Sequence, residues 1–169
     1  MFADHVRRMA RYNAWANGRI YDAVAALPRA EFEKERPAFF RSIKGTLNHL
    51  LVGDRIWLAF LSGTEHGIAR LDTILHDDLS GLRAAREAED RRLAAFVAPL
   101  DDGFYSGTLR YRSVLGDWFE TPLAVVFAHI FNHHAHHRGQ VHDLLTQTAV
   151  PPPVLDLHRF HAAEASNAA

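Results

Sequence analysis

The sequence predicts an all-α protein, a four-helix bundle with a short hairpin or irregular segment before the last helix. Three observations support this prediction. Four long stretches repeat apolar side chains every three or four residues, the period of an amphipathic helix. Proline, glycine and aspartate clusters separate these stretches. The last stretch contains the segment 128–141, which carries five of the twelve histidines of the protein and therefore indicates a chemical role.

Length and composition restrict the function. At 169 residues the chain fits one domain, and we expect a bundle over residues 1–150 followed by a C-terminal tail, 151–169. A net charge of -1 and a pI near 6.9 argue against a nucleic-acid partner. Because the chain has no cysteine, a bound metal would have nitrogen and oxygen ligands only. No signal-peptide run or membrane-span pattern is present, so we expect a soluble, cytoplasmic protein without a membrane partner.

The first helix is expected over Phe2–Leu27, because Pro28 cannot continue it. The pattern places a set of polar residues on its outer face: Arg7, Arg8, Arg11, Asn17 and Arg19. The acidic, proline-containing stretch Arg29–Arg41 is expected to form a loop.

The second helix is expected over Ile43–Ser62, with Ser42 as its N-cap. It is apolar on most of its circumference, which indicates burial by several neighbours. A surface loop should follow, and Asp77 and Asp78 favour the start of a third helix, Leu79–Val97. The charged residues of this helix are interpreted as a solvated face: Arg83, Arg86, Glu87, Glu89, Asp90, Arg91 and Arg92.

The segment Phe104–Glu120 is rich in strand-favouring residues, and Gly116-Asp117 is a suitable turn for a short hairpin. Thr121 as N-cap and Pro122 at the first helical position should begin the last helix, which is expected to reach about Thr148. The prolines at 151–153 prevent its continuation, and the tail to Ala169 should fray.

His133 and His137 are one helical turn apart and about 40° apart on the helical wheel. They face the same side as Val126 and Ile130, towards the core. Two histidines at this spacing form a preorganised chelate for a divalent metal. The alternative interpretation is a pair of buried histidines satisfied by hydrogen bonds. The other histidines of this helix are expected in supporting or surface positions: His129, His134, His136 and His142.

A metal site needs a third ligand, and His49 is the best candidate because it is the only histidine of the buried second helix. A single histidine in a protein core usually binds no metal, so the alternative that His49 is an ordinary buried histidine stays open. Asp54 lies about 140° from His49 on the wheel and is a weaker candidate.

Three motifs carry a resemblance to a known family. The form SIxxTLxHLxxxDxxW covers Ser42–Trp57, HIFNHxxHHRGQVH covers His129–His142, and RYNAWAN covers Arg11–Asn17. With these motifs the chain resembles the DinB-like (DinB/YfiT) metal-binding four-helix bundles over nearly its whole length. The resemblance implies that the metal ligands are His49, His133 and His137.

A site with three neutral imidazoles lowers the pKa of a bound water or ionises a bound thiol. Zinc and nickel suit these ligands equally. DinB-like relatives include thiol-dependent transferases, so we expect such an enzyme, acting on a small molecule with a low-molecular-weight thiol. A metal-dependent hydrolase and a non-catalytic, metal-binding stress-response bundle are the alternatives. No catalytic residue is identified, and the candidates for orienting the ligands are Asn132, His136 and Gln140.

A homodimer is also expected. Several aromatic residues lie in segments that need not all fit one small core, and exposed apolar patches usually mark contacts: Phe39, Phe40, Tyr105, Tyr111, Trp118 and Phe119. DinB-like relatives are often dimeric, which supports the same expectation.

Overall fold

A computed structural model describes residues 1–167 and confirms the all-α fold. Four long helices form the bundle: α1 (Phe2–Ala25), α3 (Ile43–Ser62), α4 (Leu79–Val97) and α5 (Leu123–Thr146). Three short helical segments accompany them: α2 (Arg29–Glu33), η1 (Phe104–Ser106) and α6 (Leu157–Asn167). None of the helices in this described part is long and apolar enough to cross a membrane.

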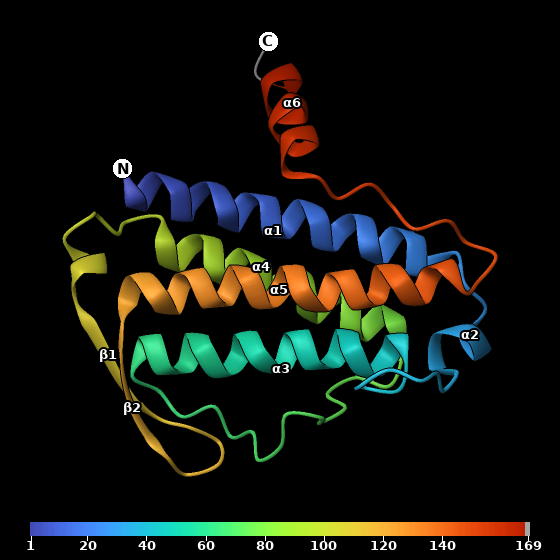
Figure 1. Ribbon diagram of the computed structural model, residues 1–169, viewed down its shortest axis with the longest axis horizontal. Helices are drawn as coiled ribbons and strands as arrows, with labels where there is room; N and C mark the ends of the chain where they lie inside the picture. The colour runs from blue at the N-terminus through green and yellow to red at the C-terminus, as the bar shows by residue number, and fades with distance from the viewer. Residues whose placement is uncertain (168–169) are drawn as a thin grey trace.

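Each long helix packs against two others. Both α1 and α3 contact α4 and α5, so the order around the bundle is α1, α4, α3, α5. The helices α1 and α5 run in one direction, and α3 and α4 run in the opposite direction (Figure 1). The α3–α5 edge of the bundle therefore lies across from the α1–α4 edge.

Side-chain caps begin two of the helices, one at Ser42 as expected and one at Asp78. The Ser42 hydroxyl accepts a hydrogen bond from the Gly45 N–H at 3.0 Å, and the Asp78 carboxylate accepts one from the Gly81 N–H at 2.7 Å. A side chain at Gly45 would collide with the carbonyl oxygen of Phe40. Glycine at this position therefore lets the preceding loop lie directly against the first turn of α3.

The predicted hairpin is present. Strand β1 (Thr108–Arg112) pairs antiparallel with β2 (Trp118–Pro122), and Gly116 takes φ 96° in the turn. The expected cap at Thr121 is wrong, because Thr121 pairs with Leu109 in the sheet and α5 begins only at Leu123. The sheet holds the start of α5, whose Leu123 N–H donates to the Gly107 carbonyl at 2.9 Å.

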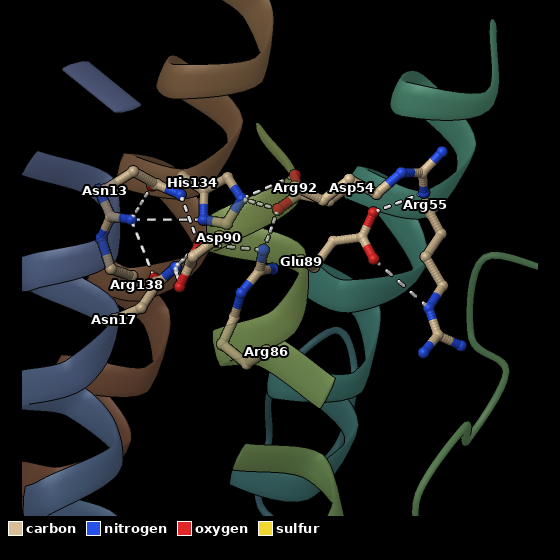
Figure 2. Close-up of polar contacts among 10 residues, drawn as sticks. All are labelled: Asn13, Asn17, Asp54, Arg55, Arg86, Glu89, Asp90, Arg92, His134 and Arg138. Atoms are coloured by element: carbon tan, nitrogen blue, oxygen red, sulfur yellow. Dashed lines mark hydrogen bonds and ion pairs between the residues drawn. The ribbon is translucent and has the colours of Figure 1, made fainter. Parts of the chain in front are cut away.

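The apolar core of the bundle has two halves with a polar layer between them. One half contains Ile20, Leu51 and Leu145, and the other contains Leu58 and Phe127. Each long helix contributes polar residues to this layer, and in its sequence they lie between the residues of one apolar half and those of the other. Figure 2 shows these polar side chains meeting in the interior. All of these side chains are buried: Asn13, Asn17, Asp54, Arg86, Asp90, His134 and Arg138.

Asp54 joins three of the four helices in this layer. Its carboxylate accepts a hydrogen bond from His134 Nε2 at 2.8 Å and pairs with Arg86 Nη2 at 2.6 Å (Figure 2). Burial alone would raise the pKa of Asp54, but the His134 imidazole and the Arg86 guanidinium hold it well below its usual range. Asp54 is therefore a buried anion at neutral pH.

Asp90 and Arg138 extend the layer to α1. The Asp90 carboxylate pairs with Arg86 Nη2 at 3.1 Å and accepts a hydrogen bond from Asn17 Nδ2 at 3.0 Å. Arg138 donates to the side-chain oxygens of Asn13 and Asn17, and its Nη1 lies 3.3 Å from His134 Nδ1. Because Arg138 donates to Nδ1, His134 is neutral with its proton on Nε2, and its complete burial lowers its pKa accordingly.

The predicted solvated face of α4 is wrong for three of its members. Arg86, Glu89 and Asp90 are buried, because their charges are paired inside the bundle or beside it. For the same reason Asn17 lies inside and not on the outer face of α1. His134 is fully buried and does not occupy a surface position.

The expectation that the tail frays is wrong for residues 157–167, which form α6. Phe160 packs on the rings of Tyr12 and Trp15, and Glu164 pairs with Arg11 Nε at 2.7 Å. These contacts hold α6 against α1 although it projects away from the bundle (Figure 1). The last two residues of the expected tail lie outside the described part of the chain.

The aromatic residues behind the dimer expectation have different environments. Tyr105 is buried in the core beside Phe127, whereas Phe39 is 83% exposed and Trp118 is 63% exposed. The homodimer stays a prediction.

Replacing Asp54 by asparagine should strongly destabilise the protein. The substitution keeps the size of the side chain but leaves Arg86 in the interior with half of its counter-charge, and such a loss typically costs about 3–5 kcal/mol. The free energy of unfolding in urea would measure the effect.

The matched control is Glu120→Gln, which removes the charge of an exposed ion pair with Arg110, where about 0–1 kcal/mol is expected. Equal losses in the two variants would contradict a structural role for the buried layer.

Candidate metal centre

Three histidines converge at the α3–α5 edge of the bundle. His49 comes from α3, and His133 and His137 come from consecutive turns of α5. One ring nitrogen from each lies within 4.8 Å of the other two. His49 and His137 are buried and His133 is half-buried. The structure therefore brings together the three residues that the sequence and the family resemblance had indicated.

The His49 ring is oriented by backbone. Its Nδ1–H donates to the carbonyl oxygen of Leu71 at 2.9 Å, which leaves the lone pair of Nε2 facing the other histidines. Asn48 holds the segment that supplies this carbonyl, because its Oδ1 accepts from the N–H groups of Leu75 and His76 at 2.8 and 3.0 Å. Two successive residues of α3 thus fix the position of one imidazole.

The His137 ring is oriented by a side chain of its own helix. Its Nδ1–H donates to Gln140 Oε1 at 2.7 Å, so its Nε2 is also free of hydrogen. The His133 ring lies against the backbone of α3 at Gly53, where an added Cβ would be 3.1 Å from its Cε1 atom. A glycine at this position lets the imidazole of α5 approach α3 closely.

The arrangement of nitrogen atoms fits a cation. His49 Nε2 and His133 Nε2 are 3.0 Å apart, and His49 Nε2 carries no proton because Nδ1 already donates to Leu71. Two lone pairs that point at each other repel, whereas a divalent ion between them accepts both. A proton on His133 Nε2 would allow a hydrogen bond to His49 Nε2, but it would leave the lone pair of the third imidazole, His137, without a partner in the cluster.

Burial keeps these imidazoles neutral, as metal coordination requires. Desolvation, followed by the neighbouring histidines, lowers the pKa of His133 to about 3. Desolvation also lowers the pKa of His137 to about 4 and lowers that of His49. The site is therefore ready to bind a cation at neutral pH.

Phe40 covers one side of the cluster. Its ring stacks on His49 with 3.9 Å between centroids and meets His137 edge-on at 5.5 Å. Phe40 also lines a cavity of about 590 Å³, together with Asp72 and Ile74. Sequence reasoning placed Phe40 only among possible dimer residues, because a loop residue has no periodicity that points to a site.

The other residues expected to support the metal ligands differ in how close they lie to the three histidines. Gln140 contacts the cluster directly, and His136 Nε2 accepts a hydrogen bond from the Gln140 amide at 3.2 Å. His129 lies beside His133 with 5.6 Å between ring centroids, and partial burial lowers its pKa. Asn132 is exposed on α5 and forms no hydrogen bond to the three histidines within the described chain.

The metal-free protein should lose stability as the pH falls below about 6.5. An unfolded histidine titrates near this value, whereas folded His133 and His137 take up protons only near pH 3 and 4. The unfolded state therefore binds more protons in between, and the free energy of unfolding decreases with falling pH. Urea unfolding in the presence of a chelator at several pH values would measure this, and a His133→Phe variant should show a shallower dependence. An unchanged slope in that variant would contradict the lowered pKa.

Replacing Gly53 by alanine should weaken metal binding, because the added methyl group displaces the His133 ring. Disturbing the support of a ligand typically costs 10–100-fold in metal affinity. Gly139→Ala is the matched control, since an added Cβ there meets nothing within 4 Å and the gain in helix propensity is similar. Competition with a chromophoric chelator would compare them, and equal affinities would argue against this packing role of Gly53.

Comparisons with known proteins give the family of the chain. The sequence matches the family model described as the DinB family over residues 1–168. A curated relative, Protein DinB of Bacillus subtilis (strain 168), is 24% identical over 154 residues, covering 86% of this chain and 87% of the relative. A bundle of four long helices, with three histidines gathered at one edge, thus accompanies a family match over nearly the full length. The chain belongs to the DinB family.

Proposed function

We propose that this protein is a metal-dependent enzyme in which His49, His133 and His137 hold one divalent ion for thiol-dependent group transfer. The observation that carries the proposal is the ligand set, three convergent imidazoles with no fourth metal-binding side chain grouped with them in the described residues. Structural zinc sites usually have four protein ligands, whereas catalytic sites have three and keep a position for water or substrate. Three ligands therefore support a catalytic role.

The composition supports a thiol supplied from outside the chain. A divalent ion such as zinc or nickel would ionise a bound thiol at neutral pH without help from a protein base. The protein has no cysteine of its own. The sulfur nucleophile is therefore proposed to belong to a low-molecular-weight thiol, which then attacks a small electrophilic substrate.

The surrounding residues have proposed roles in this chemistry. The Leu71 carbonyl and Gln140 hold the Nδ1 protons of His49 and His137, so that both rings present Nε2 to the ion. Phe40 shields His49 from water on one face, which strengthens electrostatic interactions at the site.

A hydrolase is the second candidate, favoured by two further histidines near the site. Activation of water normally requires a general base or acid. His129 is a partly buried neighbour of His133, and His136 is linked to the cluster through Gln140. Both could accept a proton near the site.

Metal content tests the ligand assignment. Elemental analysis should find about one divalent ion per chain in the wild-type protein and much less in His49→Ala, His133→Ala and His137→Ala. His142→Ala is the control, because His142 lies near Gly139 and Pro152, away from the cluster. Circular dichroism would establish that each variant is folded. Equal metal content in all of the proteins would refute the assignment.

Cobalt substitution tests the chemistry. Adding small thiols to the cobalt-loaded protein should produce a sulfur-to-metal charge-transfer band, because three protein ligands leave a position for sulfur. The band should persist in His142→Ala and disappear in His137→Ala. If thiols leave the spectrum unchanged while ester or amide substrates are hydrolysed, the hydrolase replaces the transferase. If neither occurs, the non-catalytic metal-binding bundle is supported.

A further inference from the structure

A continuous series of aromatic rings leads from the histidine cluster to the hairpin. The His133 ring lies 5.6 Å from the ring of His129, which in turn meets the indole of Trp57 with 5.1 Å between centroids. Trp57 lies 5.2 Å from Tyr111 of β1, and Tyr111 stacks on Phe119 of β2 at 5.6 Å. We call the rings beyond His133 the aromatic strip: His129, Trp57, Tyr111 and Phe119. The strip starts directly beside one of the three candidate ligands.

The aromatic strip is accessible from solvent. His129 is exposed, Phe119 is 46% exposed, and Trp57 and Tyr111 are half-buried. The hairpin carries the far end of the strip, because β1 and β2 lie beside the end of α3 and the start of α5 (Figure 1). Contiguous exposed apolar surface of this kind marks a contact with a partner or a ligand. Because the strip continues from the histidine cluster, its first rings are within reach of a molecule bound there.

The geometry of the rings indicates a ligand that is itself aromatic. Trp57 meets both His129 and Tyr111 edge-on, whereas Tyr111 and Phe119 are stacked with 20° between their planes. Phe119 meets no other aromatic ring of the described chain. The faces and edges of aromatic rings carry opposite partial charges, so they attract another aromatic ring more strongly than a saturated ring of the same size. A planar ring would therefore continue the series.

The surroundings of the strip indicate a neutral ligand. Histidines apart, the charged residues within 49–60 of α3 and 123–139 of α5 are Asp54, Arg55 and Arg138. Asp54 and Arg138 belong to the buried polar layer, and Arg55 pairs with Glu89 of α4 at 3.9 Å. The charged residues of β1 and β2 lie on the other face of the hairpin, because side chains alternate along a strand. A charged ring would therefore find no counter-ion on these elements.

We propose that the electrophilic substrate of the metal site carries a neutral aromatic ring, which packs on the aromatic strip at His129 and Trp57. The strip is then a specificity determinant, and its hairpin end extends the contact for a larger ring system. This inference rests on the proposed function, because it requires an ion with an open position at His49, His133 and His137.

Metal-binding probes of matched shape test the inference. Phenylacetohydroxamate and cyclohexylacetohydroxamate have the same chelating group and differ in whether the ring is aromatic or saturated. Acetohydroxamate has no ring and reports on the open metal position alone. Each probe is titrated into the cobalt-loaded, full-length protein, and its dissociation constant is measured from the visible spectrum. The phenyl probe should bind more tightly than acetohydroxamate, and roughly two- to tenfold more tightly than the cyclohexyl probe.

Variants locate the ring of the probe. Trp57→Leu and His129→Leu should each reduce the preference for the phenyl probe, because leucine is apolar but not aromatic. The ratio of the two dissociation constants is compared between proteins, since the shared chelating group cancels any change in the strength of the metal site. Trp118→Leu is the matched control and should keep the wild-type ratio. Trp118 is 63% exposed but pairs with Arg112 on the face of the hairpin opposite to Phe119.

The outcomes separate this inference from the proposed function. If acetohydroxamate leaves the cobalt spectrum unchanged, both are overturned. If acetohydroxamate binds but the phenyl probe has no advantage over the cyclohexyl probe, as expected where a second copy of the chain covers the strip, only this inference is overturned. An unchanged ratio in both Trp57→Leu and His129→Leu also overturns it. If Trp57→Leu does not fold, His129→Leu decides, because His129 is exposed and leucine is a good helix former.

Discussion

The electrostatic constraint on which this structure depends is the pairing of two buried carboxylates, Asp54 and Asp90, with the buried Arg86. These charges come from α3 and α4 and meet in one layer of the bundle, and unpaired burial of any of them would be expensive. The four long helices can satisfy these charges only at one relative height and rotation. Apolar packing above and below the layer supplies most of the driving force, but apolar contacts tolerate sliding more readily than fixed charge pairs do.

This constraint reaches the histidine cluster through shared helices. Asp54 follows His49 by just over one turn on α3, and His134 directly follows His133 on α5. The hydrogen bond between Asp54 and His134 therefore fixes the register of the two helices that carry the cluster. The hydrogen bonds from His49 Nδ1 to the Leu71 carbonyl and from His137 Nδ1 to Gln140 then set the rotation of these two rings. The geometry of the candidate site is thus determined by the fold and does not have to be created by an ion.

Helical periodicity was sufficient to predict the long helices and to place His133 beside His137, because both depend on positions within one helix. The burial of charged residues on α4 could not be predicted from periodicity. Arg86 and Asp90 follow the pattern of a solvated face, and only partners on α1 and α3 make their burial favourable. The roles of the Leu71 carbonyl and of Phe40 were missed for a related reason. Loop residues show no hydrophobic periodicity, and every residue has a backbone carbonyl, so the sequence does not mark the one that binds a histidine.

The order of the helices also has a consequence for how the chain reaches its native state. The helix α1 packs against α4 and α5 and not chiefly against α3, the next long helix in sequence. Closing these contacts requires intervening segments of more than fifty residues, and the entropy lost in ordering such segments is incurred before the contacts form. An up-and-down bundle, in which each helix folds back on its predecessor, avoids this cost. The arrangement seen here therefore favours slower folding than that of such a bundle of equal length, and α1 completes its packing only after α5 is available.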